Sequence, residues 1–101
     1  MPKLYEYFGI VVYFFAREHE PIHVHGKYQD REMKAEIWVD QGVITEIRIR
    51  AIAKKKPLQE PQLSDFEKIV RLYAEEIVRK WADFFLFGKK VVCKQIKRRI
   101  K

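Results

Sequence analysis

Residues 22–50 read IHVHGKYQDREMKAEIWVDQGVITEIRIR, and apolar and polar side chains alternate along most of this segment. Alternation with a period of two is typical of β-strands that bury one face. Gln29-Asp30 is polar and turn-like, and Asp40-Gln41-Gly42 has glycine where a hairpin loop needs a left-handed residue. The segment therefore predicts three antiparallel strands joined by two tight hairpins.

The alternation also predicts which residues lie opposite one another. A two-residue first turn and a three-residue second loop keep the apolar residues on one face, whereas a slip of one residue would mix the faces. The predicted apolar pairs are Gly26–Met33, Val24–Ala35, Ile22–Ile37, Val39–Val43, Ile37–Thr45 and Ala35–Ile47. The predicted polar pairs are His25–Lys34, His23–Glu36 and Glu36–Glu46, with Arg48 and Arg50 continuing the polar face.

Two further stretches precede this segment. Residues 1–8 contain several aromatic side chains and indicate a first strand, which ends at Gly9. Residues 10–15 (IVVYFF) are β-branched or aromatic throughout. They predict a central strand that is covered on both faces, or on one face with a partner on the other.

The clearest helical pattern follows residues 51–61, whose lysines and prolines indicate an exposed loop. Ser64 and Glu67 have the spacing of a capping box, in which each side chain satisfies the other's free amide, and Gly88 indicates a stop. Between them, apolar residues recur at helical spacing. They are Phe66, Ile69, Val70, Tyr73, Ile77, Trp81 and Phe84. The pattern predicts one long helix over the apolar face of the sheet.

Together these elements predict a small α+β domain over residues 1–88, in a chain of 101 residues. We expect an antiparallel sheet of four or five strands with one long C-terminal helix packed on one face. Residues 89–101 are a basic C-terminal tail, whose apolar residues fit either a last strand or an amphipathic extension.

The net charge of +7 lies entirely in this tail, because residues 1–88 contain 14 basic and 14 acidic side chains. A basic tail on a neutral body fits electrostatic attachment to nucleic acid or to an acidic protein, or a solvated terminus. The single cysteine, Cys93, cannot form an internal disulfide, which indicates a reducing compartment. The longest apolar run, residues 8–16, is too short for a bilayer span, so we expect a soluble cytoplasmic protein with no membrane partner.

All three histidines fall within seven residues, at His19, His23 and His25. His23 and His25 lie two apart on a predicted strand and therefore share a face. One interpretation is a metal site, in which His23 and His25 hold zinc or another divalent ion with a third ligand from His19 or from Glu36, and leave a position open. A second is metal-free acid–base chemistry by His19, His23 and His25 with Glu36, in which Arg48, Arg50 or the lysines at 54–56 hold phosphate. A third is a structural cluster or binding surface.

Basic residues near this face and in the tail are the candidates for nucleic-acid binding. They are Arg48, Arg50, Lys54, Lys55, Lys56, Lys97, Arg98 and Arg99. Trp38 on the polar face fits stacking on a base, or partial burial under a neighbour or in a homodimer interface.

The N-terminal half resembles a known family. Phe8-Gly9-Ile10-Val11-Val12, followed by Glu18-His19-x-Pro21-x-His23-x-His25, is similar to the small bacterial proteins called domain of unknown function 4160. That family typically has an F-G-I-x-I strand and then an acidic residue with H-x-P-x-H-x-H. The acidic residue is more usually aspartate, whereas here it is Glu18. The resemblance marks Gly9, Glu18, His19, Pro21, His23 and His25.

The resemblance implies a partner and a role. Members of the family are often thought of as half of a pair with another small protein encoded nearby, in the manner of toxin–antitoxin modules. The leading hypothesis is a toxin-like component that acts on RNA through the histidines, with one as base and another as acid. The alternatives are a non-enzymatic module that binds a partner protein, and a metal-dependent hydrolase that uses the H-x-H pair.

Overall fold

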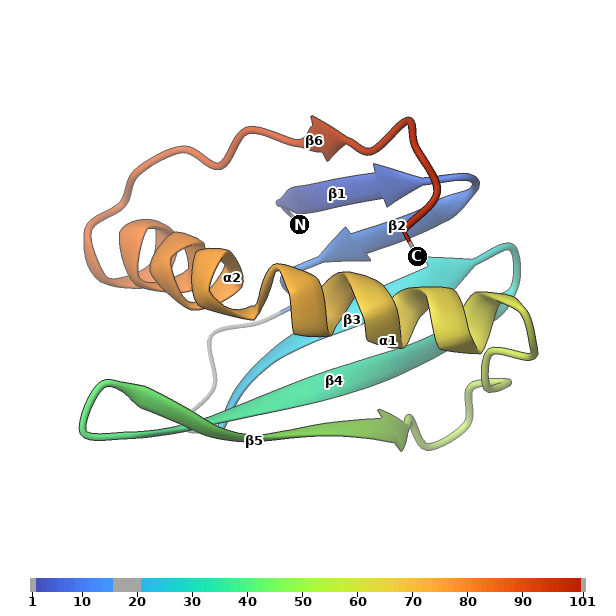
Figure 1. Ribbon diagram of the computed structural model, residues 1–101, viewed down its shortest axis with the longest axis horizontal. Coiled ribbons are helices and arrows are strands. Elements are labelled where there is room, and N and C mark those ends of the chain that lie inside the picture. The colour runs from blue at the N-terminus through green and yellow to red at the C-terminus, as the bar shows by residue number, and fades with distance from the viewer. Residues whose placement is uncertain (1, 16–20, 101) are drawn as a thin grey trace.

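The computed structural model describes residues 2–15 and 21–100. The strands are β1 (Lys3–Tyr7), β2 (Ile10–Tyr13), β3 (Ile22–Tyr28), β4 (Arg31–Asp40), β5 (Val43–Ala51) and β6 (Lys94–Gln95). The helices are α1 (Gln62–Leu72), α2 (Ala74–Trp81) and the short π-helical segment η1 (Ala82–Leu86). Figure 1 shows α1 and α2 crossing the same side of a single twisted sheet.

The sheet has six strands in the order β5-β4-β3-β2-β1-β6. Neighbours from β1 to β5 run antiparallel, but β6 runs parallel to β1. The predicted α+β class is therefore confirmed. The prediction of four or five antiparallel strands is wrong, because part of the basic tail adds a sixth strand beside β1.

The register of the first predicted hairpin is confirmed. Gly26 lies opposite Met33, and His25 lies opposite Lys34. The Gln29-Asp30 turn holds two residues, since Tyr28 pairs with Arg31. A turn of the same length joins β1 to β2, where Tyr7 pairs with Ile10.

The register of the second predicted hairpin is wrong. The loop is a two-residue turn of Gln41 and Gly42, which both have positive φ, as turns that match the strand twist require. The pairing then shifts near Trp38, where the hydroxyl of Thr45 donates to the Trp38 carbonyl at 3.3 Å. This β-bulge adds one residue to β5, and together with the shorter turn it places every later partner two positions away from the prediction.

The bulge changes what lies on each face of β5. Glu36 lies opposite Arg48 instead of Glu46. Ile44 packs against the core, while Val43, predicted to face the core, is 64% exposed. Alternation cannot reveal this change, because the bulge reverses the alternation at one point.

The predicted long helix is two short helices. Tyr73 separates α1 from α2 with φ −105° and ψ 16°, outside the helical range, and its ring stacks on Tyr5 at 4.8 Å. The predicted capping box is also wrong. The helix begins two residues before Ser64, whose amide and hydroxyl both donate to the Glu60 carboxylate.

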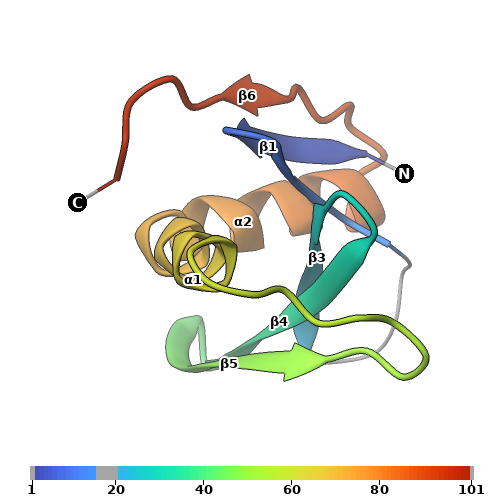
Figure 2. The same ribbon diagram turned by 90° about the vertical axis from the view of Figure 1, so that its right-hand side faces the viewer.

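The helices still cover the sheet as their apolar pattern predicts. Phe66, Ile69, Val70 and Ile77 are fully buried in the core. In Figure 2 the helices lie within the curve of the sheet, on one side of it. Among the described residues no helix covers the opposite side, which we call the open face. No helix in this part of the chain is both long and apolar enough to cross a membrane.

The basic tail lies along the edge of the sheet. The Ile96 amide donates to the Glu6 carbonyl at 2.9 Å, and the Ile100 amide donates to the Tyr7 hydroxyl at 3.0 Å. Arg99 lies 4.1 Å from the centre of the Phe8 ring and pairs with an acidic residue of α1. The sequence left open a last strand at residues 91–93 or an amphipathic extension, whereas the tail forms a short strand further along, at Lys94–Gln95.

Gly26 is expected to be essential for seating α1 on the sheet. A Cβ atom at this position would lie 2.5 Å from two ring carbons of Phe66. Gly26→Ala should therefore lower the free energy of unfolding by about 1–3 kcal/mol, as measured by urea denaturation. Phe66→Leu should relieve the clash, so the double variant should be more stable than the sum of the single effects allows. If the losses in unfolding free energy of the two single variants simply add in the double variant, the predicted contact between residue 26 and Phe66 is wrong.

Candidate functional site

A hydrogen-bonded cluster lies on the open face and joins three strands. Nδ1 of His25 on β3 lies 2.6 Å from Oε2 of Glu32 on β4, and both side chains are more than nine-tenths buried. The Tyr13 hydroxyl on β2 donates to the same carboxylate oxygen at 2.6 Å. We call Tyr13, His25 and Glu32 the polar network.

Sheet register explains why these three residues meet. Tyr13 lies directly opposite His25 across β2 and β3. Glu32 lies opposite Lys27, one diagonal step from His25 on the same face. All three side chains therefore project from neighbouring positions of the sheet.

Burial and hydrogen bonding set the charges of the network. Burial lowers the pKa of His25, although its bond to Glu32 acts in the opposite direction. Burial acts to raise the pKa of Glu32, but the hydrogen bonds from His25 and Tyr13 outweigh it, and the pKa lies below its usual value. Burial, with the bond to Glu32, raises the pKa of Tyr13. Near pH 7 the network therefore holds a neutral imidazole, a carboxylate and a neutral phenol.

The carboxylate also selects the tautomer of His25. An ionised carboxylate can only accept hydrogen bonds, so Nδ1 of His25 carries the proton. Nε2 is then the unprotonated nitrogen, with a lone pair that can accept a proton or bind a cation. This is the arrangement in which carboxylates orient histidines in acid–base sites.

Aromatic rings frame this histidine. Phe15 stacks on His25 with ring centres 4.8 Å apart and an angle of 10°. The ring of Tyr13 lies 5.6 Å away, and that of His23 lies 5.8 Å away. Phe15 is nevertheless 46% exposed, so its edge of the cluster is open to solvent.

The three histidines that were predicted to form the site lie in different surroundings. His25 is the centre of the polar network. His23 is also buried, with Nδ1 at 3.4 Å from the Pro21 carbonyl. His19, like Glu18 of the family motif, lies outside the described residues.

The metal interpretation stays a prediction. Within residues 2–15 and 21–100, no three side chains of His, Cys, Asp or Glu converge on a common metal position. The predicted set of His19, His23 and His25 includes one residue outside these ranges. Of its two described members, His25 could bind a metal only through Nε2, because Nδ1 already donates to Glu32.

The predicted acidic partner forms a different cluster. Glu36 accepts a hydrogen bond from Nε of Arg50 at 2.6 Å, and Lys34 lies 3.9 Å from it. Arg48 pairs with Glu46 and lies 5.7 Å from the ring centre of Trp38. The predicted arginines therefore lie on the open face, paired with acids.

The remaining predicted basic residues lie at two separate places. Nζ of Lys55 is 4.0 Å from Glu32, and Lys56 pairs with Asp30 at 3.1 Å, while the neighbouring Lys54 is exposed. Lys97, Arg98 and Arg99 belong to the tail beyond β6. The loop that contains Lys54, Lys55 and Lys56 thus reaches the polar network, while Arg99 forms an ion pair with Asp65.

Sequence reasoning missed Glu32, Tyr13 and Phe15. Glu32 had a signal, because the predicted register of β3 and β4 already places it diagonally across from His25. Tyr13 and Phe15 could not be placed, since the register of β2 against β3 depends on residues 14–21, where alternation is absent.

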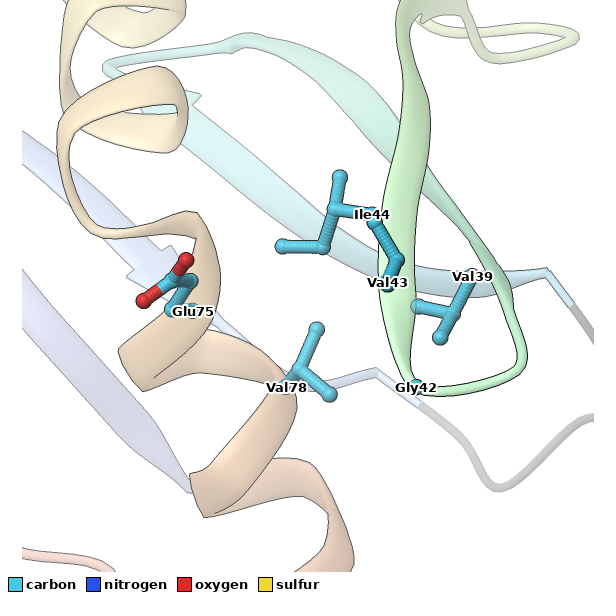
Figure 3. Close-up of a pocket in the computed structure, with 6 residues that line it drawn as sticks. All are labelled: Val39, Gly42, Val43, Ile44, Glu75 and Val78. Carbon is cyan, nitrogen blue, oxygen red and sulfur yellow. The ribbon is translucent and has the colours of Figure 1, made fainter.

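The structure has two surface depressions of interest. One, of about 280 Å³, is lined by Lys3, Val11, Tyr13 and Lys27. The other, of about 430 Å³, lies between the β4–β5 hairpin and α2, and its lining is mostly aliphatic (Figure 3). The first shares Tyr13 with the polar network, whereas the second lies on the helix side of the sheet.

The fold and the site define a class of small α+β protein with a buried histidine–carboxylate pair on the sheet face opposite its helices. The chain belongs to the family described as Domain of unknown function (DUF4160), whose model matches residues 9–82. The matched region runs from the β1–β2 turn through α2 and includes the whole polar network. No curated protein and no solved structure matches the chain.

Acid should destabilise the protein through His25. Unfolded histidine gains a proton near pH 6.5, whereas burial keeps folded His25 neutral to lower pH. The unfolded state then binds more protons, so the free energy of unfolding falls as pH drops below about 6.5, by at most about 1.4 kcal/mol per pH unit for this group. Urea denaturation in EDTA at several pH values measures the slope. His25→Asn should flatten it, and an unchanged slope would refute the assignment.

Proposed function

We propose that the protein acts on RNA at the open face, with His25 as the acid–base group. The observation that carries this proposal is the buried hydrogen bond between His25 and Glu32. It fixes the tautomer and orientation of the imidazole and leaves Nε2 as a proton acceptor. A neutral imidazole near pH 7 has the protonation state that a general base needs.

The rest of the open face fits a single-stranded nucleic acid. Phe15 and Trp38 are large aromatic residues that are 46% and 38% exposed, and each can stack on a base. Basic side chains also project from β3, β4 and β5 on this face. They include Lys27, Lys34, Arg48 and Arg50. Sheets that combine exposed aromatic rings with basic residues recognise unstacked RNA in this way.

The proposed reaction is cleavage through the ribose 2′-hydroxyl. His25 Nε2 accepts the proton of this hydroxyl, and the oxygen attacks the adjacent phosphorus. The bond from phosphorus to the 5′-oxygen breaks, which leaves a 2′,3′-cyclic phosphate and a 5′-hydroxyl. The leaving oxygen takes a proton from an acid, for which His23 is the nearest described histidine, at 5.8 Å between ring centres. Basic groups stabilise the charge that develops on phosphate.

This activity fits the toxin-like half of a two-protein module, which the family resemblance suggested. In such a module the partner protein restrains the RNA-cleaving component. The aliphatic depression beside α2 offers a surface for such a partner, because Val43 at its rim is 64% exposed. The same observation favours the second candidate function, a non-enzymatic module that binds a partner through this surface.

Acid–base function predicts that His25 variants lose cleavage while keeping RNA binding. His25→Gln should lower the cleavage rate of a single-stranded RNA by about 10²- to 10⁴-fold. Glu32→Gln should lower it as well, because the amide no longer fixes the tautomer. Near-ultraviolet circular dichroism would verify that each variant is folded. Full activity in folded His25→Gln would disprove the catalytic role, and intact RNA with the wild-type protein would favour the binding module.

Base stacking predicts a separate loss of affinity. Trp38→Ala should weaken binding of a single-stranded RNA by about 5- to 150-fold, since each stacked base contributes about 1–3 kcal/mol. Phe87→Ala is the matched control, because Phe87 is 69% exposed at the end of η1, away from the open face. Equal affinities for the two variants would contradict RNA binding at the open face.

A further inference from the structure

The depression beside the polar network is built from three neighbouring strands. Lys3 on β1 lies opposite Tyr13 on β2, and Lys27 on β3 lies opposite Val11 on β2. The two lysines therefore stand on either side of β2, at diagonal positions. Val11 and Tyr13 form the part of the depression between them.

Sheet geometry allows both ammonium groups to reach one anion. Two strand spacings and two residues along a strand separate the lysine Cα atoms by roughly 12 Å. Each lysine side chain is long and flexible, with a strongly hydrated point charge at its end. The intervening depression, of about 280 Å³, has room for a phosphate group.

The acidic groups around the depression leave this positive charge available. Nζ of Lys3 lies 3.7 Å from Glu6, a pair exposed enough to contribute little to stability. Glu32 lies opposite Lys27, but its Oε2 already accepts from both Tyr13 and His25, and Nζ of Lys55 lies 4.0 Å from its Oε1. Among the described residues, an incoming phosphate would therefore compete mainly with Glu6 for Lys3.

Tyr13 connects this depression to the proposed reaction site. Its ring lines the depression, while its hydroxyl donates to the carboxylate that orients His25. A phosphate between the two lysines would thus lie one side chain away from the imidazole. This separation suits an RNA phosphate that is next to the reacting phosphate along the RNA chain.

We propose that Lys3 and Lys27 form a phosphate subsite, which holds the RNA backbone beside the phosphate on which His25 acts. This inference rests on the proposed function for the identity of the ligand as RNA. The anion-binding part rests only on the two lysines and the depression. Neither lysine was among the residues that sequence reasoning selected.

The test compares two double variants that remove the same charge. Lys3→Gln with Lys27→Gln removes the subsite. Lys68→Gln with Lys90→Gln removes two exposed lysines that line neither depression. The probes are inorganic phosphate, followed by amide NMR shifts, and a ten-nucleotide single-stranded RNA, whose affinity is measured at several salt concentrations.

We expect phosphate to shift the amides of Lys3, Val11, Tyr13 and Lys27 in the wild-type and control proteins, and not in the subsite variant. Loss of one phosphate contact should lower the slope of log affinity against log salt by about 0.7. At 0.1 M salt that change corresponds to about a fivefold loss of RNA affinity. The control should match the wild-type protein in slope.

The outcomes separate the subsite from the function. If the subsite variant binds RNA with wild-type affinity and slope, the subsite is wrong, while the proposed function stands. If the wild-type protein binds no RNA but phosphate shifts these four amides, and the shifts vanish in the subsite variant, the anion site is supported and the proposed function is wrong.

Discussion

The hydrogen bond between His25 and Glu32 is the interaction that the open face depends on. β3 lies inside the sheet and is buried on both sides, with apolar residues toward the helices and histidines toward the open face. A buried carboxylate without partners would cost several kcal/mol. Tyr13 and His25 remove that cost, and together they tie β2, β3 and β4 through one oxygen, Oε2 of Glu32. The same contacts that make burial tolerable also hold the imidazole in one tautomer.

Structural and chemical constraints meet in two adjacent residues of β3. His25 faces the polar network, and Gly26 faces Phe66 of α1 so closely that a side chain there would clash. α1 therefore packs directly against β3 at Gly26, next to the position where His25 projects from the other face of the same strand. Because the strand is clamped from both sides, the imidazole has little freedom to move. A rigid support of this kind is what a positioned acid–base group requires.

Much of this arrangement was predictable from the sequence, up to definite physical limits. Alternation determined the β3–β4 register because both faces are chemically distinct throughout. It failed at β5, where the bulge at Thr45 reverses the faces without any change in composition. Helical periodicity runs unbroken through Tyr73, so the break there was invisible. The histidine cluster was evident, and the β3–β4 register placed Glu32 diagonally across from His25, but the register alone does not tell which neighbouring polar residue pairs with the imidazole.

The parallel pairing of β6 with β1 has a consequence for how the protein folds. Tyr5 pairs with Lys94, so the sheet joins residues near opposite ends of the chain. Closing such a long loop costs more chain entropy than forming a hairpin, and few contacts repay it, because β6 has only two residues. The β-meander from β1 to β5 can assemble from local turns before this last strand docks. The outer edge of β1 is thus the last backbone edge to be protected during folding, and transient opening in the native state would start there.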